Sequence, residues 1–401
     1  MKNRLITITL SVLLPIILFG GNKPKYVFYF IGDGMGFNHV SLAELYNGYN
    51  QGVWGPLPLS FSQFPVLGIS TTYSASNLIT DSAAGGTALA TGEKTTNGVI
   101  AMEPDCSEPL NSIAYKIHDA GYRVGITSTV GINHATPASF YAHNCSRSNY
   151  YEIAKEMGES GFEFYGGGGI ISHNGNNKDQ MSIYELLPQQ GYTVVEGIEN
   201  FDSANGAEKV FLTHNYGWEV NTLKYAIDQN ENDMTHADIV AAAIEFLYRE
   251  NSKGFFLLSE GGKIDWSSHS NDAKTTALEV LDLSDAISIA LEFYNRFPDE
   301  TLIVVTADHE TGGLALAKGN GYNIYLNELD FQECSKDFVT KKGIKAIDKA
   351  TEKAHIGWTT VDHSGANVPV FAIGASSELF SGRMNNIEIP ERICKAMEIE
   401  Y

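Results

Sequence analysis

Apolar runs of strand length recur along the chain, and longer stretches with helical periodicity separate them. The clearest candidate strands are residues 26–31, 124–129, 254–258, 302–306 and 368–373. Apolar residues recur every three or four positions in residues 111–120, 235–249 and 274–293, which predicts helices there. This alternation is typical of a mostly parallel sheet that helices cover on both faces. We therefore predict an α/β fold around one large, mostly parallel central sheet.

Two stretches interrupt the rhythm. Residues 150–234, approximately, are rich in Gly, Asn and Tyr, and residues 316–360 are rich in Lys and polar side chains. We interpret both as insertions over the active-site side of the sheet, so that residues 24–401 form a single domain. The run of glycines at residues 166–169 predicts a turn, and no Lys-Ser/Thr pair and helix follow it as in a phosphate-binding loop.

The N-terminus has the pattern of an export signal. Lys2 and Arg4 precede a mostly apolar run from Leu5 to Phe19, and Gly20 and Gly21 follow it. We predict a signal peptide at residues 1–21, a periplasmic or secreted protein and no stable membrane span. The alternative is an uncleaved anchor, because the cleavage region lacks a clean small-x-small pattern.

Charge and cysteine usage narrow the choice of partners. A net charge of -21 argues against nucleic acid as a binding partner, since that binding depends on clustered Lys and Arg. A phosphate substrate would need local positive charge from metal ions or one placed Arg. The four cysteines, which lie far apart, could pair in three ways or remain free: Cys106, Cys145, Cys334 and Cys394.

Acidic side chains follow three of the candidate strands. Asp33 ends FYFIGD, Glu260 ends GFFLLSE, and Asp308 and His309 end TLIVVTADH. Side chains beyond the carboxyl ends of parallel strands converge on one crevice. Carboxylates that meet there repel one another, and bound cations relieve the repulsion. The pattern therefore predicts a metal site.

Three more side chains fit such a site. Asp265 and His269 are four residues apart in EGGKIDWSSH, which places them on one face of a helical turn. His363 precedes the last candidate strand. Any one of these residues alone is more often structural, but the joint pattern favours metal ligation.

Ser82 is the candidate nucleophile. It opens a run of small residues, Ala83 to Ala90, that suits a closely packed helix. A hydroxyl at a helix N-terminus lies at the positive end of the helix dipole, which favours a bound phosphate. The alternative is that Thr80, Asp81 or Ser82 only caps the helix.

Together these segments resemble the alkaline phosphatase family, from about Tyr26 to Gly374. The resemblance implies a large parallel sheet between helices and three metal ions in a shallow pocket. It implies that Asp265, His269 and His363 hold one zinc, that Asp33, Ser82, Asp308 and His309 surround a second, and that Asp33, Thr136 and Glu260 hold a magnesium. Arg147, which taken alone resembles a surface residue, matches the phosphate-binding arginine of the family.

The implied activity is hydrolysis of small phosphate monoesters through a phosphoserine intermediate, with broad specificity. Zinc would activate the Ser82 hydroxyl, and inorganic phosphate and an alcohol would be released. The resemblance also implies a homodimer. The chain departs from the most studied bacterial pattern at His134 and Trp266, where an Asp and a Lys are common. An imidazole there favours zinc or cobalt at the third site, with His134 as a ligand.

Two other functions are compatible with parts of this pattern. A phosphodiesterase or sulfatase of the same superfamily would share the paired metals, but Thr136, Glu260 and Arg147 favour monoesters. A non-catalytic metal-binding or adhesion protein would be expected to have lost a ligand or the nucleophile. None of these residues is missing here.

Overall fold

The computed structural model describes residues 22–249, 253–319 and 321–401. The predicted signal peptide at residues 1–21 lies outside this part of the chain.

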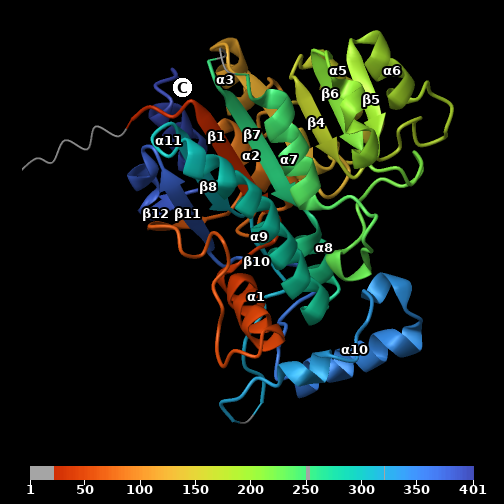
Figure 1. Ribbon diagram of the computed structural model, residues 1–401, viewed down its shortest axis with the longest axis vertical. Helices are drawn as coiled ribbons and strands as arrows, with labels where there is room; N and C mark the ends of the chain where they lie inside the picture. The colour runs from red at the N-terminus through yellow and green to blue at the C-terminus, as the bar shows by residue number, and fades with distance from the viewer. Residues whose placement is uncertain (1–21, 250–252, 320) are drawn as a thin grey trace, which may run out of the picture.

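A ten-stranded sheet forms the centre of the molecule, in the order β12-β2-β11-β8-β1-β7-β3-β4-β6-β5 (Figure 1). All its paired strands are parallel except for the pairings of β11, which runs antiparallel to β2 and β8. The strands are β1 (Tyr26–Gly32), β2 (Val66–Thr71), β3 (Arg123–Ser128), β4 (Phe164–Gly167), β5 (Tyr192–Glu196), β6 (Lys209–Thr213), β7 (Phe255–Gly261), β8 (Thr301–Thr306), β11 (Val368–Gly374) and β12 (Gly382–Asn385). The predicted fold class is confirmed.

Helices cover both faces of the sheet, and successive residues of β1 enter opposite halves of the core. Tyr29 packs on the side of α2, α3, α5, α6 and α11, whereas Phe28 packs on the side of α1, α7 and α9. These helices are α1 (Phe37–Asn50), α2 (Ser82–Thr91), α3 (Ile113–Asp119), α5 (Tyr150–Glu159), α6 (Ile183–Gln189), α7 (His236–Leu247), α9 (Ala273–Arg296) and α11 (Glu388–Ala396). The central strand is therefore apolar throughout, because neither of its faces meets water.

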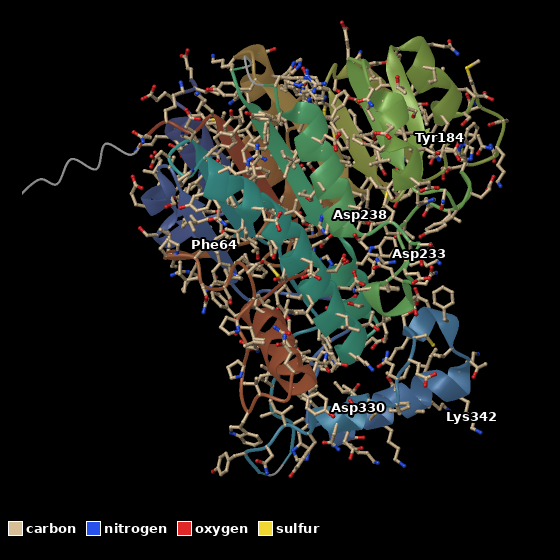
Figure 2. All side chains as sticks on the ribbon, viewed as in Figure 1. Phe64, Tyr184, Asp233, Asp238, Asp330 and Lys342 are labelled. Atoms are coloured by element: carbon tan, nitrogen blue, oxygen red, sulfur yellow. A yellow bond between two sulfur atoms is a disulfide. The ribbon has the colours of Figure 1, made fainter. Side chains whose placement is uncertain are left out.

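Our interpretation of residues 150–234 as an insertion over the sheet was wrong. Their strands β4, β5 and β6 continue the same sheet beyond β3 (Figure 1). Figure 2 shows the resulting width, with Phe64 and Tyr184 on opposite sides of the molecule. The sequence analysis missed these strands because each has only four or five residues and β4 is half glycine. Gly166 and Gly167 belong to β4 rather than to a turn. A Cβ on Gly167 would lie 2.4 Å from the Ser128 carbonyl oxygen, which explains the glycine.

Residues 316–360 contribute no strand to the ten-stranded sheet within the described part of the chain. Their longest element is α10 (Lys341–Lys353), which lies well away from the sheet in Figure 1. Figure 2 labels Lys342 within this helix and Asp330 near it. Two short strands flank this stretch and pair with each other, β9 (Glu310–Thr311) and β10 (His363–Ser364). Among the described residues, no helix has the length and apolar character that crossing a membrane requires.

Candidate active site

Strand register brings the candidate residues to one edge of the sheet. Ile31 of β1 is paired with Glu260 of β7 and with Thr306 of β8, so these strands end at the same level. Asp33 and Asp308 therefore emerge beside Glu260. Because β11 runs the other way, its beginning lies at this edge, and the preceding β10 carries His363 there. Ser82 comes from α2, Thr136 from α4 (Ala135–Ala138) after β3, and Asp265 and His269 from α8 (Lys263–His269) after β7. His134 is the N-cap residue of α4, and Arg147 lies between α4 and α5.

Asp265, His269 and His363 form the first ligand cluster. The Nε2 atoms of His269 and His363 lie 3.2 Å apart. Asp265 Oδ1 lies 3.3 Å from His269 Nε2 and 3.5 Å from His363 Nε2. Both Nδ1 atoms lie within hydrogen-bonding distance of backbone carbonyls, those of Val361 and Thr80. These bonds turn the Nε2 atoms toward the common centre, as in protein metal sites.

Asp33, Asp308 and His309 form the second cluster, beside Ser82. His309 Nε2 lies 3.4 Å from Asp33 Oδ1, 3.1 Å from Asp308 Oδ2 and 3.2 Å from the Ser82 hydroxyl oxygen. Asp308 Oδ1 accepts backbone N–H groups from Gly34 and His309. Asp308 Oδ2 and both oxygens of Asp33 are buried without a hydrogen-bond partner. Buried carboxylate oxygens without hydrogen-bond donors are suited to coordinate a cation.

Asp33, His134 and Glu260 form the third cluster, with ligand atoms within 4.8 Å of one another. Ser128 donates a hydrogen bond to Glu260 Oε2. Three atoms here are buried and unpartnered: Glu260 Oε1, His134 Nδ1 and Thr136 Oγ1. Asp33 belongs to two clusters, so it lies where it could bridge two ions.

Burial and mutual repulsion perturb the acids strongly. Burial, reinforced by the neighbouring Asp308, raises the pKa of Asp33 well above its ordinary value. Burial likewise raises the pKa of Glu260 to about 8, against the opposing hydrogen bond from Ser128. The hydrogen bond to Asp265 raises the pKa of His269 to about 9. Cations at these positions would remove the repulsion, so the donor set fits divalent metals such as zinc and magnesium.

Asp81, rather than Ser82, caps helix α2. Its Oδ1 accepts the backbone N–H of Ala84 at 3.0 Å, and Ser82 is the first residue of the helix. The Ser82 hydroxyl is therefore free to face His309. Of the three residues considered as helix caps, Asp81 therefore fills that role and Ser82 does not.

Arg147 lies at the site. Its Nη1 donates to Asp81 Oδ2 at 3.0 Å, and its Nη2 lies 3.2 Å from His134 Nε2. A disulfide between Cys106 and Cys145 ties down the segment that precedes it, whereas Cys334 and Cys394 are free. The guanidinium is thus held next to both the helix cap and the third cluster.

The sequence model of the family described as "Alkaline phosphatase" matches residues 24–168, 167–341 and 323–399. The chain belongs to the alkaline phosphatase family. Alkaline phosphatase 3 of Bacillus subtilis is 31% identical, in an alignment that covers 93% of this chain and 89% of that protein. Alkaline phosphatase 4 of the same organism is 29% identical over 93% and 89%. The family is metal-dependent, and the activity of this chain is hydrolysis of phosphate monoesters.

Solved alkaline phosphatases share the fold. The enzyme from the Antarctic bacterium TAB5 superimposes with a TM-score of 0.77 at 30% identity, covering 95% of this chain and 100% of that one. The cold-active enzyme from Shewanella sp. gives a TM-score of 0.81 at 29% identity, covering 93% and 99%. A variant of the TAB5 alkaline phosphatase was solved with Mg bound in its M3 site.

The sequence analysis missed the contacts that three residues make with the site residues, although it considered Asp81 as a possible helix cap. Asp81 holds Arg147, Ser128 holds Glu260, and the Thr311 hydroxyl donates to Asp265. Only Asp81 carried a signal, as the neighbour of Ser82. Trp266 packs edge-on against His134, with ring centroids 5.8 Å apart, so it limits where that imidazole can lie.

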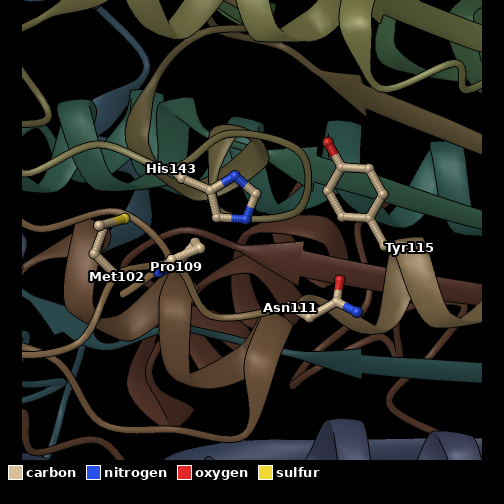
Figure 3. A pocket seen from close by; sticks show the side chains of 5 residues that line it. All are labelled: Met102, Pro109, Asn111, Tyr115 and His143. Atoms are coloured by element: carbon tan, nitrogen blue, oxygen red, sulfur yellow. The ribbon is translucent and has the colours of Figure 1, made fainter. Parts of the chain in front are cut away.

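A separate pocket has no connection with this chemistry. Figure 3 shows its lining residues, which include none of the ligands: Met102, Pro109, Asn111, Tyr115 and His143. Its polar groups are largely engaged, because the Tyr115 hydroxyl donates to the Tyr141 carbonyl and His143 lies 3.3 Å from Glu156. We assign no role in phosphate ester hydrolysis to it.

Proposed function

We propose that Ser82 is the nucleophile and that hydrolysis proceeds through a phosphoserine intermediate. The observation that carries this proposal is the position of the Ser82 hydroxyl, 3.2 Å from His309 Nε2 and beside the unpartnered oxygens of Asp33 and Asp308. The other serine hydroxyls that bond a histidine ring in the described part of the chain are Ser182 with His173, Ser259 with His236 and Ser268 with His39.

 None of these histidines belongs to a ligand cluster, so among the described residues only the Ser82 hydroxyl lies within hydrogen-bonding distance of a cluster imidazole.

We propose two zinc ions and one magnesium ion as cofactors. Asp265, His269 and His363 would hold the first zinc, and Asp33, Asp308 and His309, with Ser82, would hold the second. Asp33, Glu260, Thr136 and His134 would hold the third ion, and the imidazole makes zinc or cobalt an alternative to magnesium there. When bound, these ions lower the pKa of coordinated hydroxyl groups and neutralise the charge that develops on the phosphoryl and leaving-group oxygens.

The side chains of this chain divide the remaining work. Arg147 can donate two parallel N–H groups to the non-bridging oxygens of the phosphoryl group, because its guanidinium is a planar fork. The Ser82 hydroxyl gives up its proton as its oxygen forms a bond to phosphorus, the bond from phosphorus to the alcohol oxygen breaks, and that oxygen takes up a proton and leaves as the alcohol. Water then attacks the phosphoserine from the vacated side, which releases inorganic phosphate and restores the Ser82 hydroxyl.

We also propose export to the periplasm or the medium, a homodimer, and broad specificity for monoesters. The pattern of residues 1–21 supports export, and so does the disulfide between Cys106 and Cys145, because disulfides persist in oxidising compartments. The homodimer rests on the family resemblance. Broad specificity follows from a mechanism that holds the phosphoryl group and leaves the alcohol portion outside.

Ser82→Ala tests the assignment. We expect the wild type to hydrolyse an aryl phosphate monoester in preference to the matching diester and sulfate, and the variant to lose several orders of magnitude in kcat. Mass spectrometry of acid-quenched wild type should find phosphate on Ser82 and none in the variant. Preference for the diester or sulfate would favour the alternative activities, and undiminished turnover by the variant would exclude Ser82 as nucleophile.

A further inference from the structure

Thr311 lies between the first and the second ligand clusters, although it belongs to neither of them. It is fully buried at the end of β9. Its backbone pairs with that of His363 across the β9–β10 ladder, and its N–H donates to the carbonyl of Gly34, next to Asp33. Gly34 packs so closely that an added Cβ would lie 2.7 Å from Thr311 Oγ1. The hydroxyl therefore has a fixed position.

That hydroxyl touches ligands of two different clusters. It donates to Asp265 Oδ1 of the first cluster at 2.5 Å, and it lies 3.2 Å from His309 Nδ1 of the second. A threonine hydroxyl has one proton to donate, and an ionised carboxylate has none. Both contacts are hydrogen bonds only if His309 carries its proton on Nδ1 and donates it to Thr311. The lone pair of His309 Nε2 then faces Ser82, Asp33 and Asp308.

We propose that Thr311 is a positioning residue that couples the first two metal sites: its one hydroxyl orients Asp265 and fixes the Nδ1-protonated tautomer of His309. This inference rests on the proposed metal-dependent function. Groups of this kind, which hold the ligands of a metal from behind, commonly change metal affinity by 10- to 100-fold when they are removed. Since Thr311 contacts both clusters, its loss should weaken two sites at once.

Thr311→Val and Thr311→Ser separate the hydroxyl from the shape of the side chain. Valine keeps the branched shape without the hydroxyl, and serine keeps the hydroxyl. Metal-free proteins would be titrated with zinc in competition with a chromogenic chelator. For Thr311→Val we expect two zinc equivalents to bind roughly 10- to 100-fold more weakly, and for Thr311→Ser we expect affinities close to those of the wild type.

Ser128→Ala is the matched control, because Ser128 holds Glu260 of the third cluster. We expect this variant to weaken a single metal equivalent and to leave the other two unchanged. Wild-type zinc affinity in Thr311→Val would overturn the inference, and so would equal losses in Thr311→Ser and Thr311→Val. A wild-type protein that binds no zinc would instead overturn the proposed function, and this inference with it.

The tautomer can be measured without relying on any variant at position 311 to fold. In zinc-loaded wild-type protein with ¹⁵N-labelled histidine, the His309 signal, assigned by its loss in His309→Gln, should show a proton on Nδ1 and none on Nε2. The same signal should persist in Thr311→Ser. A wild-type His309 that carries its proton on Nε2 would overturn the inference.

Discussion

At the scale of single residues, the active site combines opposite electrostatic environments a few ångströms apart. Burial works against the charge of Asp265, but hydrogen bonds from His269 and His363 lower its pKa well below the ordinary value. Asp33 is buried equally, but its carboxylate oxygens accept no hydrogen bond and Asp308 lies beside it, so burial and that neighbour raise its pKa. The difference arises from the partners, because both carboxyls are removed from water.

Arg147 offers the clearest test of phosphate recognition. We expect Arg147→Ala to lower kcat/KM for an aryl phosphate on the order of 100-fold or more, because two charge-assisted hydrogen bonds to the phosphoryl group are lost. Arg147→Lys should restore only part of the loss, since an ammonium cannot reproduce the fork. Arg383→Ala, which removes an exposed arginine from β12, is the control. Equal kinetics for Arg147→Ala and the control would refute this role.

At the scale of elements, the segment that carries Arg147 is fastened at several points. Its backbone N–H donates to the Gly98 carbonyl, Gly98 N–H donates to Asp81 Oδ2, and Ile100 pairs with Asn144. The disulfide from Cys106 to Cys145 closes a loop with a sequence separation of 39. Helix α2 and this loop therefore hold the nucleophile and the arginine in one rigid arrangement.

Removal of the disulfide should affect both stability and catalysis. For Cys106→Ser combined with Cys145→Ser, we expect the free energy of unfolding to fall by roughly 2–4 kcal/mol, because the unfolded chain regains the freedom of the closed loop. We also expect KM to rise, since Arg147 lies two residues beyond Cys145. Denaturant titration and steady-state kinetics measure the two effects. Cys334→Ser, which removes a free cysteine, should change neither.

At the scale of the whole molecule, the sheet gathers acids in its interior that cations must compensate. The strands β1, β7 and β8 are fully buried and end together, so Asp33, Glu260 and Asp308 have no access to bulk water. Metal binding and folding should therefore be linked, since an ion that binds only the folded chain stabilises it.

We expect the chelated protein to lose stability as pH rises from about 7 to about 9. Burial raises the pKa of Glu260 to about 8. The hydrogen bond between His269 and Asp265 raises the pKa of His269 to about 9. In this window both groups keep protons in the folded protein that the unfolded chain has released, so a rise in pH favours unfolding. Thermal unfolding at several pH values, with chelator and with zinc and magnesium, measures the effect. Stability of the chelated protein that increases over this range would contradict it.

The sequence by itself determined the core strands, the main helices and the class of chemistry. Long apolar runs such as those of β1 and β8 have a strong periodic signal, and each acid that follows such a run emerges at the edge of the sheet. The signal failed for β4, β5 and β6, because each has only four or five residues and β4 also contains two glycines. Their place in the sheet depends on pairing with β3 and with one another.

Only the tertiary structure decided which distant side chains meet. The antiparallel direction of β11 brings His363 to the edge where the parallel strands end. The contacts of Asp81 with Arg147 and of Thr311 with Asp265 join residues 66 and 46 positions apart, far beyond the range of any helix or strand period. Periodicity reports the environment of one segment at a time, whereas hydrogen-bond geometry between segments is set by how the whole sheet and its helices pack.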